Sequence, residues 1–177
     1  MKEKSLQKKT GILGIGNVLL SDEGFGVHTV HYLEQHFTFP ETVETTDAGT
    51  AGIYMAPFLE EHDPILVIDV VAIDAAPGSI HCFSSKDIGK GTIPRKMSPH
   101  QLGLLELLEV CTLRESCPET VEFFCVVPVD LSTSMDLSPQ IKARVKEMAE
   151  RIVAWLREAG HTITEKINVT EKGMFNA

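Results

Sequence analysis

Three acids and one histidine stand where they could do chemistry together. Glu23 follows the first apolar segment, Asp47 ends a short predicted strand, and Asp69 interrupts the most apolar segment of the chain. His100 lies in the first turn of a predicted helix. Two carboxylates and an imidazole form an O,O,N donor set that suits a borderline divalent cation such as zinc, nickel, iron or manganese. The residue types therefore predict a metal site without choosing the metal.

Each of these residues also has an ordinary structural explanation. Glu23 could be a solvated acid at the positive end of a helix dipole. Asp47 could hold an Asx turn at Ala48-Gly49, and His100 could be a surface residue on a well-capped helix. Asp69 is hardest to explain in this way, because an unpaired carboxylate is costly to bury in so apolar a strand. The four residues together favour a site more strongly than any one of them.

The elements that must position these residues alternate between strand and helix. We expect strands at residues 10–15, 42–46, 65–71, 79–84 and 121–127, and helices at residues 23–37, 52–61, 98–110 and 138–160. The third and fourth strands are joined by too few residues for a parallel crossover, so we expect them to pair antiparallel. The pattern predicts an α/β fold: a three-layer sandwich with helices on both faces of a mostly parallel twisted sheet of about five strands, one of them antiparallel. Ligands of such sheets bind beyond the carboxyl ends of the strands, which is where the acids are expected to lie.

The length of 177 residues suits a single domain. We expect that domain to span residues 1–177, with flexible ends at residues 1–9 and 166–177. The last helix should bury one apolar face; its residues are Ile141, Val145, Met148, Ile152 and Leu156.

The composition excludes several classes of partner. A net charge of −9 argues against nonspecific binding to nucleic acid or to an anionic membrane. No segment approaches the roughly 18 apolar residues of a membrane span. Glycines and an asparagine interrupt the apolar stretch after the Lys-rich start, which argues against a signal peptide. The four cysteines form no C-x-x-C pair, so we expect reduced thiols and a cytoplasmic protein.

Several enzyme classes lack their motifs here. The chain contains no H-E-x-x-H, no G-x-S-x-G and no phosphate-binding P-loop. Asp47-Ala48-Gly49 is not the Asp-Thr/Ser-Gly of aspartic proteases. Gly14-Ile15-Gly16 begins like a dinucleotide fingerprint, but Leu19 stands where the third glycine belongs. A dinucleotide oxidoreductase is therefore the weakest alternative.

Four ordered sequence blocks resemble those of the nickel–iron hydrogenase maturation endopeptidases. The blocks are GIGNVLLSDEGFG at 14–26, DAGTAG at 47–52, IDVV at 68–71 and SPHQLGL at 98–104. The resemblance spans about residues 10–160. It implies an endopeptidase that removes the C-terminal extension of the hydrogenase large-subunit precursor after nickel insertion and recognises the bound nickel.

The same resemblance implies roles for individual residues. Glu23, Asp69 and His100 match the metal-binding positions of the family, while Asp47 lies in a family block and is kept as a supporting or proton-handling acid. The implied metal is the nickel of the substrate, and another divalent ion such as zinc or cadmium could occupy the site. A resident metal that activates water is the competing account. A non-catalytic metal-binding or docking module for hydrogenase assembly is the alternative function.

Overall fold

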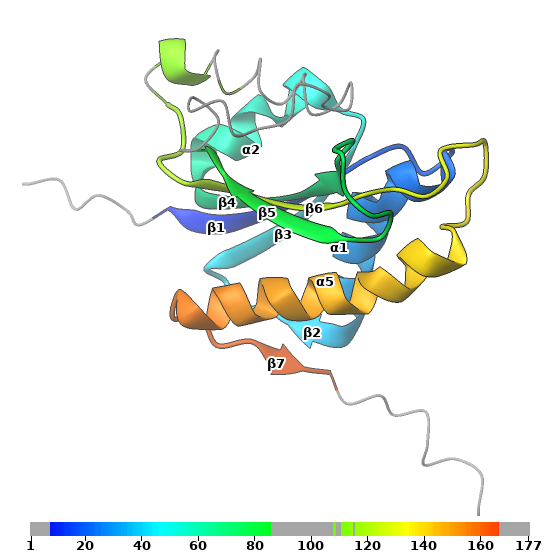
Figure 1. Cartoon of the computed structure of the whole chain (residues 1–177). Coiled ribbons are helices and arrows are strands. Elements are labelled where there is room, and N and C mark those ends of the chain that lie inside the picture. The colour runs from blue at the N-terminus through cyan, green and yellow to red at the C-terminus, as the bar shows by residue number, and fades with distance from the viewer. Residues whose placement is uncertain (1–7, 86–107, 109–110, 115, 167–177) are drawn as a thin grey trace, which may run out of the picture.

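Five strands form one sheet in the order β3-β1-β4-β6-β5 (Figure 1). The computed structural model describes residues 8–85, 108, 111–114 and 116–166. The strands of the sheet are β1 Lys9–Ile15, β3 Val43–Gly49, β4 His62–Val70, β5 Ile80–Ser84 and β6 Val121–Val126. Pairing is parallel between β1 and β3, β1 and β4, and β4 and β6, whereas β5 pairs antiparallel with β6. The predicted α/β class, with one antiparallel strand, is confirmed.

Helices cover both faces of this sheet, as Figure 1 shows. Those that the structure describes from end to end are η1 Ser21–Gly24, α1 Phe25–His36, η2 Gly52–Met55, α2 Ala56–Glu61 and α5 Pro139–Glu158. α1 and α5 lie on one face and α2 lies on the other. Each face has its own apolar core.

The alternation of side chains along β4 assigns Asp69 to one of these faces. Successive residues of a strand point to opposite faces of the sheet. Leu66 and Ile68 belong to the core beneath α1 and α5, whereas Ile65 and Val67 belong to the core beneath α2. Asp69 has the parity of Ile65 and Val67, so it lies on the α2 face.

Glycines bring the start of α1 into contact with the sheet. A Cβ at Gly26 would lie 2.2 Å from the carbonyl oxygens of both Ile15 and Ile68. A Cβ at Gly14 would lie 2.5 Å from the carbonyl oxygen of Gly26. Real Cβ atoms do not approach backbone so closely, so both positions require glycine. The first turn of α1 is thereby held against the carboxyl ends of β1 and β4.

The partner of β5 differs from the one that the sequence predicts. β5 runs antiparallel as expected, but it pairs with β6 rather than with β4. β6 is almost wholly buried and β5 is half-exposed. The more apolar strand therefore occupies the interior position beside β4, and β5 forms the edge.

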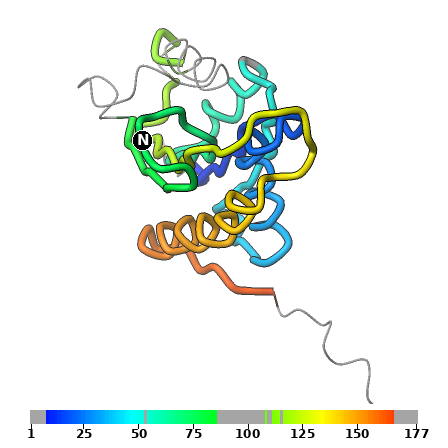
Figure 2. Tube along the Cα trace, turned by 45° about the vertical axis from the view of Figure 1, so that its right-hand side comes forward, coloured from blue at the N-terminus to red at the C-terminus, as the bar shows by residue number. Residues whose placement is uncertain are grey.

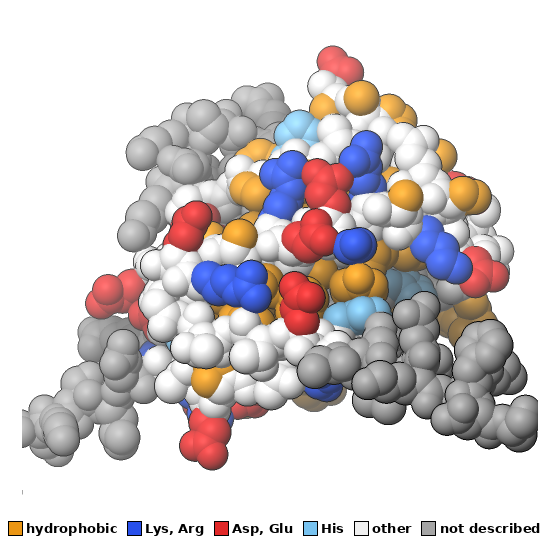
Figure 3. All heavy atoms as spheres, turned by 90° about the horizontal axis from the view of Figure 1, so that it is seen from below, with side chains coloured by type: hydrophobic (Ala, Val, Ile, Leu, Met, Phe, Trp, Pro, Cys, Tyr) orange, Lys and Arg blue, Asp and Glu red, His pale blue; other side chains and the backbone are white. Residues whose placement is uncertain are grey.

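The last helix confirms its prediction closely. Ser138 is the N-cap residue of α5, and Pro139 occupies the first helical position. All five predicted apolar positions are buried. On the opposite face of α5, acidic and basic side chains alternate, as Figure 3 shows from below; they include the ion pairs of Glu147 with Arg144 and Arg151.

The ends of the described chain are tied to the fold. Lys9 belongs to β1, and the Lys166 N–H donates to the carbonyl of His36 at 2.7 Å. A small sheet of β2 Phe37–Thr38 and β7 Thr164–Glu165, which the sequence did not predict, joins the C-terminal segment to the end of α1. The predicted helix at residues 98–110 lies outside the described residues except at its end, where Leu108 is helical. Among the helices of the described part, none is long and apolar enough to cross a membrane.

Candidate active site

Glu23 and Asp69 lie at the same edge of the sheet. η1, which carries Glu23, follows β1 after a short loop and contacts β4. A Cβ at Gly16, just past the end of β1, would lie 1.8 Å from the Glu23 carbonyl oxygen, so the backbone of Glu23 lies directly against that strand end. Asp69 is the penultimate residue of β4, whose Ile68 pairs with Gly14 of β1. The structure therefore brings these two predicted ligands to the carboxyl ends of adjacent strands.

Both carboxylates are withdrawn from water. Asp69 is fully buried and Glu23 is 8% exposed. One oxygen of Asp69 accepts the N–H of Val70 at 2.7 Å. Buried carboxylates need hydrogen bonds or positive charge for compensation. Two of them at one sheet edge are a donor set that suits a divalent cation.

Cys125 lies opposite Asp69 on the neighbouring strand β6. Burial, first, and then the negative charge of Asp69 and the nearby Cys82 raise the pKa of the Cys125 thiol well above its usual range. The thiol is therefore protonated at neutral pH. Cys125 is 1% exposed and packs in the apolar core on the α2 face of the sheet.

Asp22, beside Glu23, is a buried anchor that sequence reasoning missed. Its Oδ2 accepts the N–H groups of Val129 and Asp130 at 2.9 and 2.8 Å and the Ser138 hydroxyl at 2.9 Å. Its Oδ1 accepts the Ser138 N–H at 2.7 Å. The sequence places Asp22 only at the start of a helix, because the groups that bind it lie more than a hundred residues away. These bonds join η1 to the segment between β6 and α5 and fix the backbone that carries Glu23.

Asp47 lies on the other face of the sheet from Asp69. Its carboxylate pairs with His31 of α1 at 3.2 Å and accepts the Gly49 N–H at 2.9 Å. The second bond is the Asx turn that the sequence offered as an alternative. Asp47 is exposed, and the structure does not bring it together with Asp69. Its role as a supporting acid stays a prediction.

The third predicted ligand, His100, lies outside the described residues. Within residues 8–85, 108, 111–114 and 116–166, no group of three or more His, Cys, Asp or Glu side chains is placed to hold a metal ion. A three-donor site at Glu23 and Asp69 therefore needs a ligand from elsewhere in the chain, and His100 is the residue that the sequence offers.

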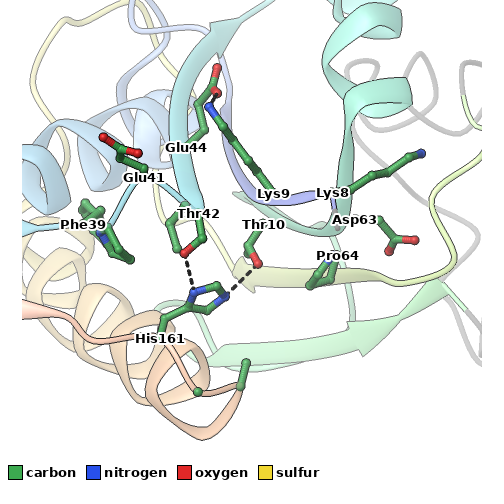
Figure 4. A pocket seen from close by; sticks show the side chains of 14 residues that line it. Lys8, Lys9, Thr10, Phe39, Glu41, Thr42, Glu44, Asp63, Pro64 and His161 are labelled. Atoms are coloured by element: carbon green, nitrogen blue, oxygen red, sulfur yellow. Dashed lines mark hydrogen bonds and ion pairs between the residues drawn. The ribbon is translucent and has the colours of Figure 1, made fainter. Parts of the chain in front are cut away.

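A cavity of about 890 Å³ lies at the opposite edge of the sheet (Figure 4). It is lined by the first residues of β1, β3 and β4 and by the loop after α5. The hydroxyls of Thr10 and Thr42 lie 2.9 and 3.1 Å from the two ring nitrogens of His161, which ties that loop to the sheet. In parallel α/β sheets the ligand site lies at the other edge, so this cavity is not the candidate active site.

Comparisons with known proteins find relatives over most of the chain. A sequence profile described as hydrogenase maturation protease matches residues 27–155. The Hydrogenase 2 maturation protease of Escherichia coli is 33% identical over 150 residues, which cover 84% of this chain and 91% of that protein. The hydrogenase expression/formation protein HupD of Bradyrhizobium diazoefficiens is 30% identical over 94% of this chain and 87% of its own length.

The fold has a solved counterpart among these relatives. The structure of the hydrogenase maturating endopeptidase HybD from E. coli superposes with a TM-score of 0.82 at 31% identity, covering 89% of this chain and 98% of that one. Sequence and fold therefore agree over most of both chains. The chain belongs to the hydrogenase maturation protease family and is an endopeptidase.

Proposed function

We propose that this endopeptidase removes the C-terminal extension from the large-subunit precursor of a nickel–iron hydrogenase, after nickel has been inserted. The observation that carries the proposal is the placement of Glu23 and Asp69 at one sheet edge, both buried. Relatives named as hydrogenase maturation proteases support the class of substrate.

In this proposal the nickel ion arrives as part of the substrate. Glu23, Asp69 and His100 would bind it and so orient the peptide bond to be cleaved. Hydrolysis adds the water oxygen to the carbonyl carbon, breaks the C–N bond and gives a proton to the leaving amine. Positioning of this kind contributes orders of magnitude in rate, because the reacting groups no longer lose their freedom in the reaction itself.

The contacts around Glu23 and Asp69 restrict the movement of the backbone that carries them. Glu23 lies on a backbone that Gly16 contacts from one side and that is anchored by the hydrogen bonds of Asp22. Asp69 lies in a central strand. Their burial lowers the local dielectric, which strengthens the attraction between the carboxylates and a cation.

The test is a processing assay with two forms of the precursor. Wild-type enzyme is incubated with nickel-loaded and with nickel-free precursor, and the mass of the large subunit is measured. We expect shortening only of the nickel-loaded form. If the nickel-loaded precursor stays intact, the proposed function is wrong; if both forms are shortened at equal rates, the endopeptidase assignment stands and nickel recognition is wrong.

Variants test the site within the same assay. Glu23→Gln, Asp69→Asn and His100→Ala should each slow processing by roughly 100-fold, because each removes one donor that positions the substrate. Glu41→Gln is the matched control, since Glu41 lines the cavity at the opposite edge. Thermal unfolding checks that every variant is folded. Normal processing by all three site variants would rule out the proposed ligand set.

A further inference from the structure

Four exposed apolar side chains border the candidate active site. They are Leu19, Val129, Leu131 and Met135, which are 55%, 48%, 51% and 69% exposed. We call this set the rim patch. Leu19 precedes η1, and the other three lie in the segment between β6 and α5.

Backbone hydrogen bonds join the two segments that carry the rim patch. The Ser134 N–H donates to the Leu19 carbonyl at 3.1 Å, and the Ser21 N–H donates to the Ser134 carbonyl at 2.7 Å. The Asp22 N–H donates to the Asp130 carbonyl at 3.1 Å. Figures 1 and 2 show the two segments side by side, in blue and in yellow. The patch is therefore presented by one fixed surface and not by two independent loops.

This surface continues directly into the backbone of Glu23. The Glu23 N–H donates to the Leu20 carbonyl at 3.1 Å, so the residue after Leu19 is bonded to the proposed ligand. Leu19 therefore lies next to the turn that carries Glu23, beside the candidate active site. Asp130 and Asp136 stand among the apolar residues of the patch. Exposed apolar groups with polar neighbours are typical of protein–protein contact sites.

We propose that the rim patch is the docking surface for an apolar segment of the precursor polypeptide. The inference rests on the proposed function, because it takes the precursor as the partner. A second copy of the chain is a poorer occupant, since a copy seated on the patch would cover the sheet edge where Glu23 and Asp69 lie. Docking on the patch would contribute to affinity for the precursor, whereas the donors at the sheet edge position the bond that is cleaved.

The triple variant Leu19→Ser, Leu131→Ser, Met135→Ser tests this division of roles. We expect KM for the nickel-loaded precursor to rise by about tenfold or more, because apolar contacts at the centre of an interface dominate binding. We expect kcat to stay within about twofold. The control variant is Leu113→Ser, which alters a side chain that is 85% exposed and lies outside the rim patch.

Each outcome decides the inference. Suppose that wild-type enzyme processes the precursor. If the triple variant then has an unchanged KM, or if the control variant raises KM as much as the triple variant does, the assignment of the docking surface is wrong and the proposed function stands. If wild-type enzyme does not process the precursor, the proposed function is wrong; calorimetric titration of wild type and triple variant with precursor then tests the patch alone, and equal affinity overturns it. Sedimentation of both proteins identifies a contact between copies, which also overturns the inference if only wild type is dimeric. If the triple variant melts early, the single variants Leu19→Ser and Met135→Ser carry the same comparison.

Discussion

Asp22→Asn is the substitution that most directly tests how the site is held in place. Asparagine keeps the shape of the side chain and removes its charge. Among the described residues, the hydrogen-bond partners of the Asp22 carboxylate are all donors: three N–H groups and one hydroxyl. If the amide oxygen of asparagine replaces Oδ2, which accepts three of the bonds, its NH₂ group replaces Oδ1. The NH₂ group then faces the Ser138 N–H, which donates to Oδ1 at 2.7 Å in the wild-type protein. One bond is then lost to a contact between two donors.

The magnitude follows from these four bonds. A hydrogen bond to a charged group contributes about 1.5–3 kcal/mol, and a buried donor without an acceptor costs about 1–3 kcal/mol. Asparagine keeps three bonds without charge assistance and loses the fourth. We therefore expect the free energy of unfolding to fall by about 2–4 kcal/mol. A loss of about 3 kcal/mol corresponds to a Tm lower by roughly 6–12 °C for a chain of this size.

Urea unfolding followed by circular dichroism measures this loss. The midpoint should move to lower urea with an unchanged slope, because the surface exposed on unfolding is the same. Asp47→Asn is the control, since Asp47 is an exposed carboxylate whose ion pair with His31 is solvated; we expect it to change stability by less than about 1 kcal/mol. If Asp22→Asn unfolds within about 0.5 kcal/mol of wild type, the four bonds do not anchor the segment between β6 and α5.

Three further predictions concern packing, thiol chemistry and pH. Gly26→Ala should destabilise the protein by about 1–3 kcal/mol in urea unfolding, because its methyl group would lie 2.2 Å from two carbonyl oxygens; wild-type stability would refute the close packing of α1 on the sheet. A thiol reagent at pH 8 should label the exposed Cys82 in the native protein, whereas it should label Cys125 only after denaturation, because burial raises the pKa of the Cys125 thiol. Peptide mass mapping identifies the labelled cysteine. Rapid labelling of Cys125 in the native protein would contradict its burial. Burial, and then the neighbouring His31, lower the pKa of His28 below 6.5, so the unfolded chain binds a proton at higher pH than the native protein. The stability of the wild-type protein should therefore fall as pH drops through 6.5. In thermal melts, the Tm of His28→Gln should fall less between pH 7 and pH 5.5 than the Tm of wild type. An equal fall in Tm for both proteins would show that His28 does not contribute to the pH dependence.

Local sequence signals predicted the elements well where one strong pattern governs them. The spacing of its apolar residues predicted α5, and all five expected core positions are buried. The continuous apolar run predicted the strand β4, which occupies the middle position of the sheet. In both cases a regular pattern of apolar side chains becomes buried, and that burial stabilises the helix or the strand. The pattern can be read directly from the sequence.

Pairing between distant segments was harder to predict. The short connection after β4 indicated an antiparallel neighbour for β5, but β6 occupies the place between them. The strands β2 and β7 pair through two residues each, which are too few to show an alternating pattern in the sequence. Such choices depend on competition among segments for the apolar interior of the sheet, and no single segment contains that information.

The types of chemistry available, the order of the elements and the family to which the ordered blocks point could all be predicted before folding, because they depend on residue identity and local spacing. The folded chain was needed to show that Glu23 and Asp69 lie at one edge of the sheet, that Asp47 points to the face away from Asp69, and that Asp22 binds the segment between β6 and α5. Those relations depend on register, strand parity and contacts between residues far apart in the chain, which form only when the sheet assembles.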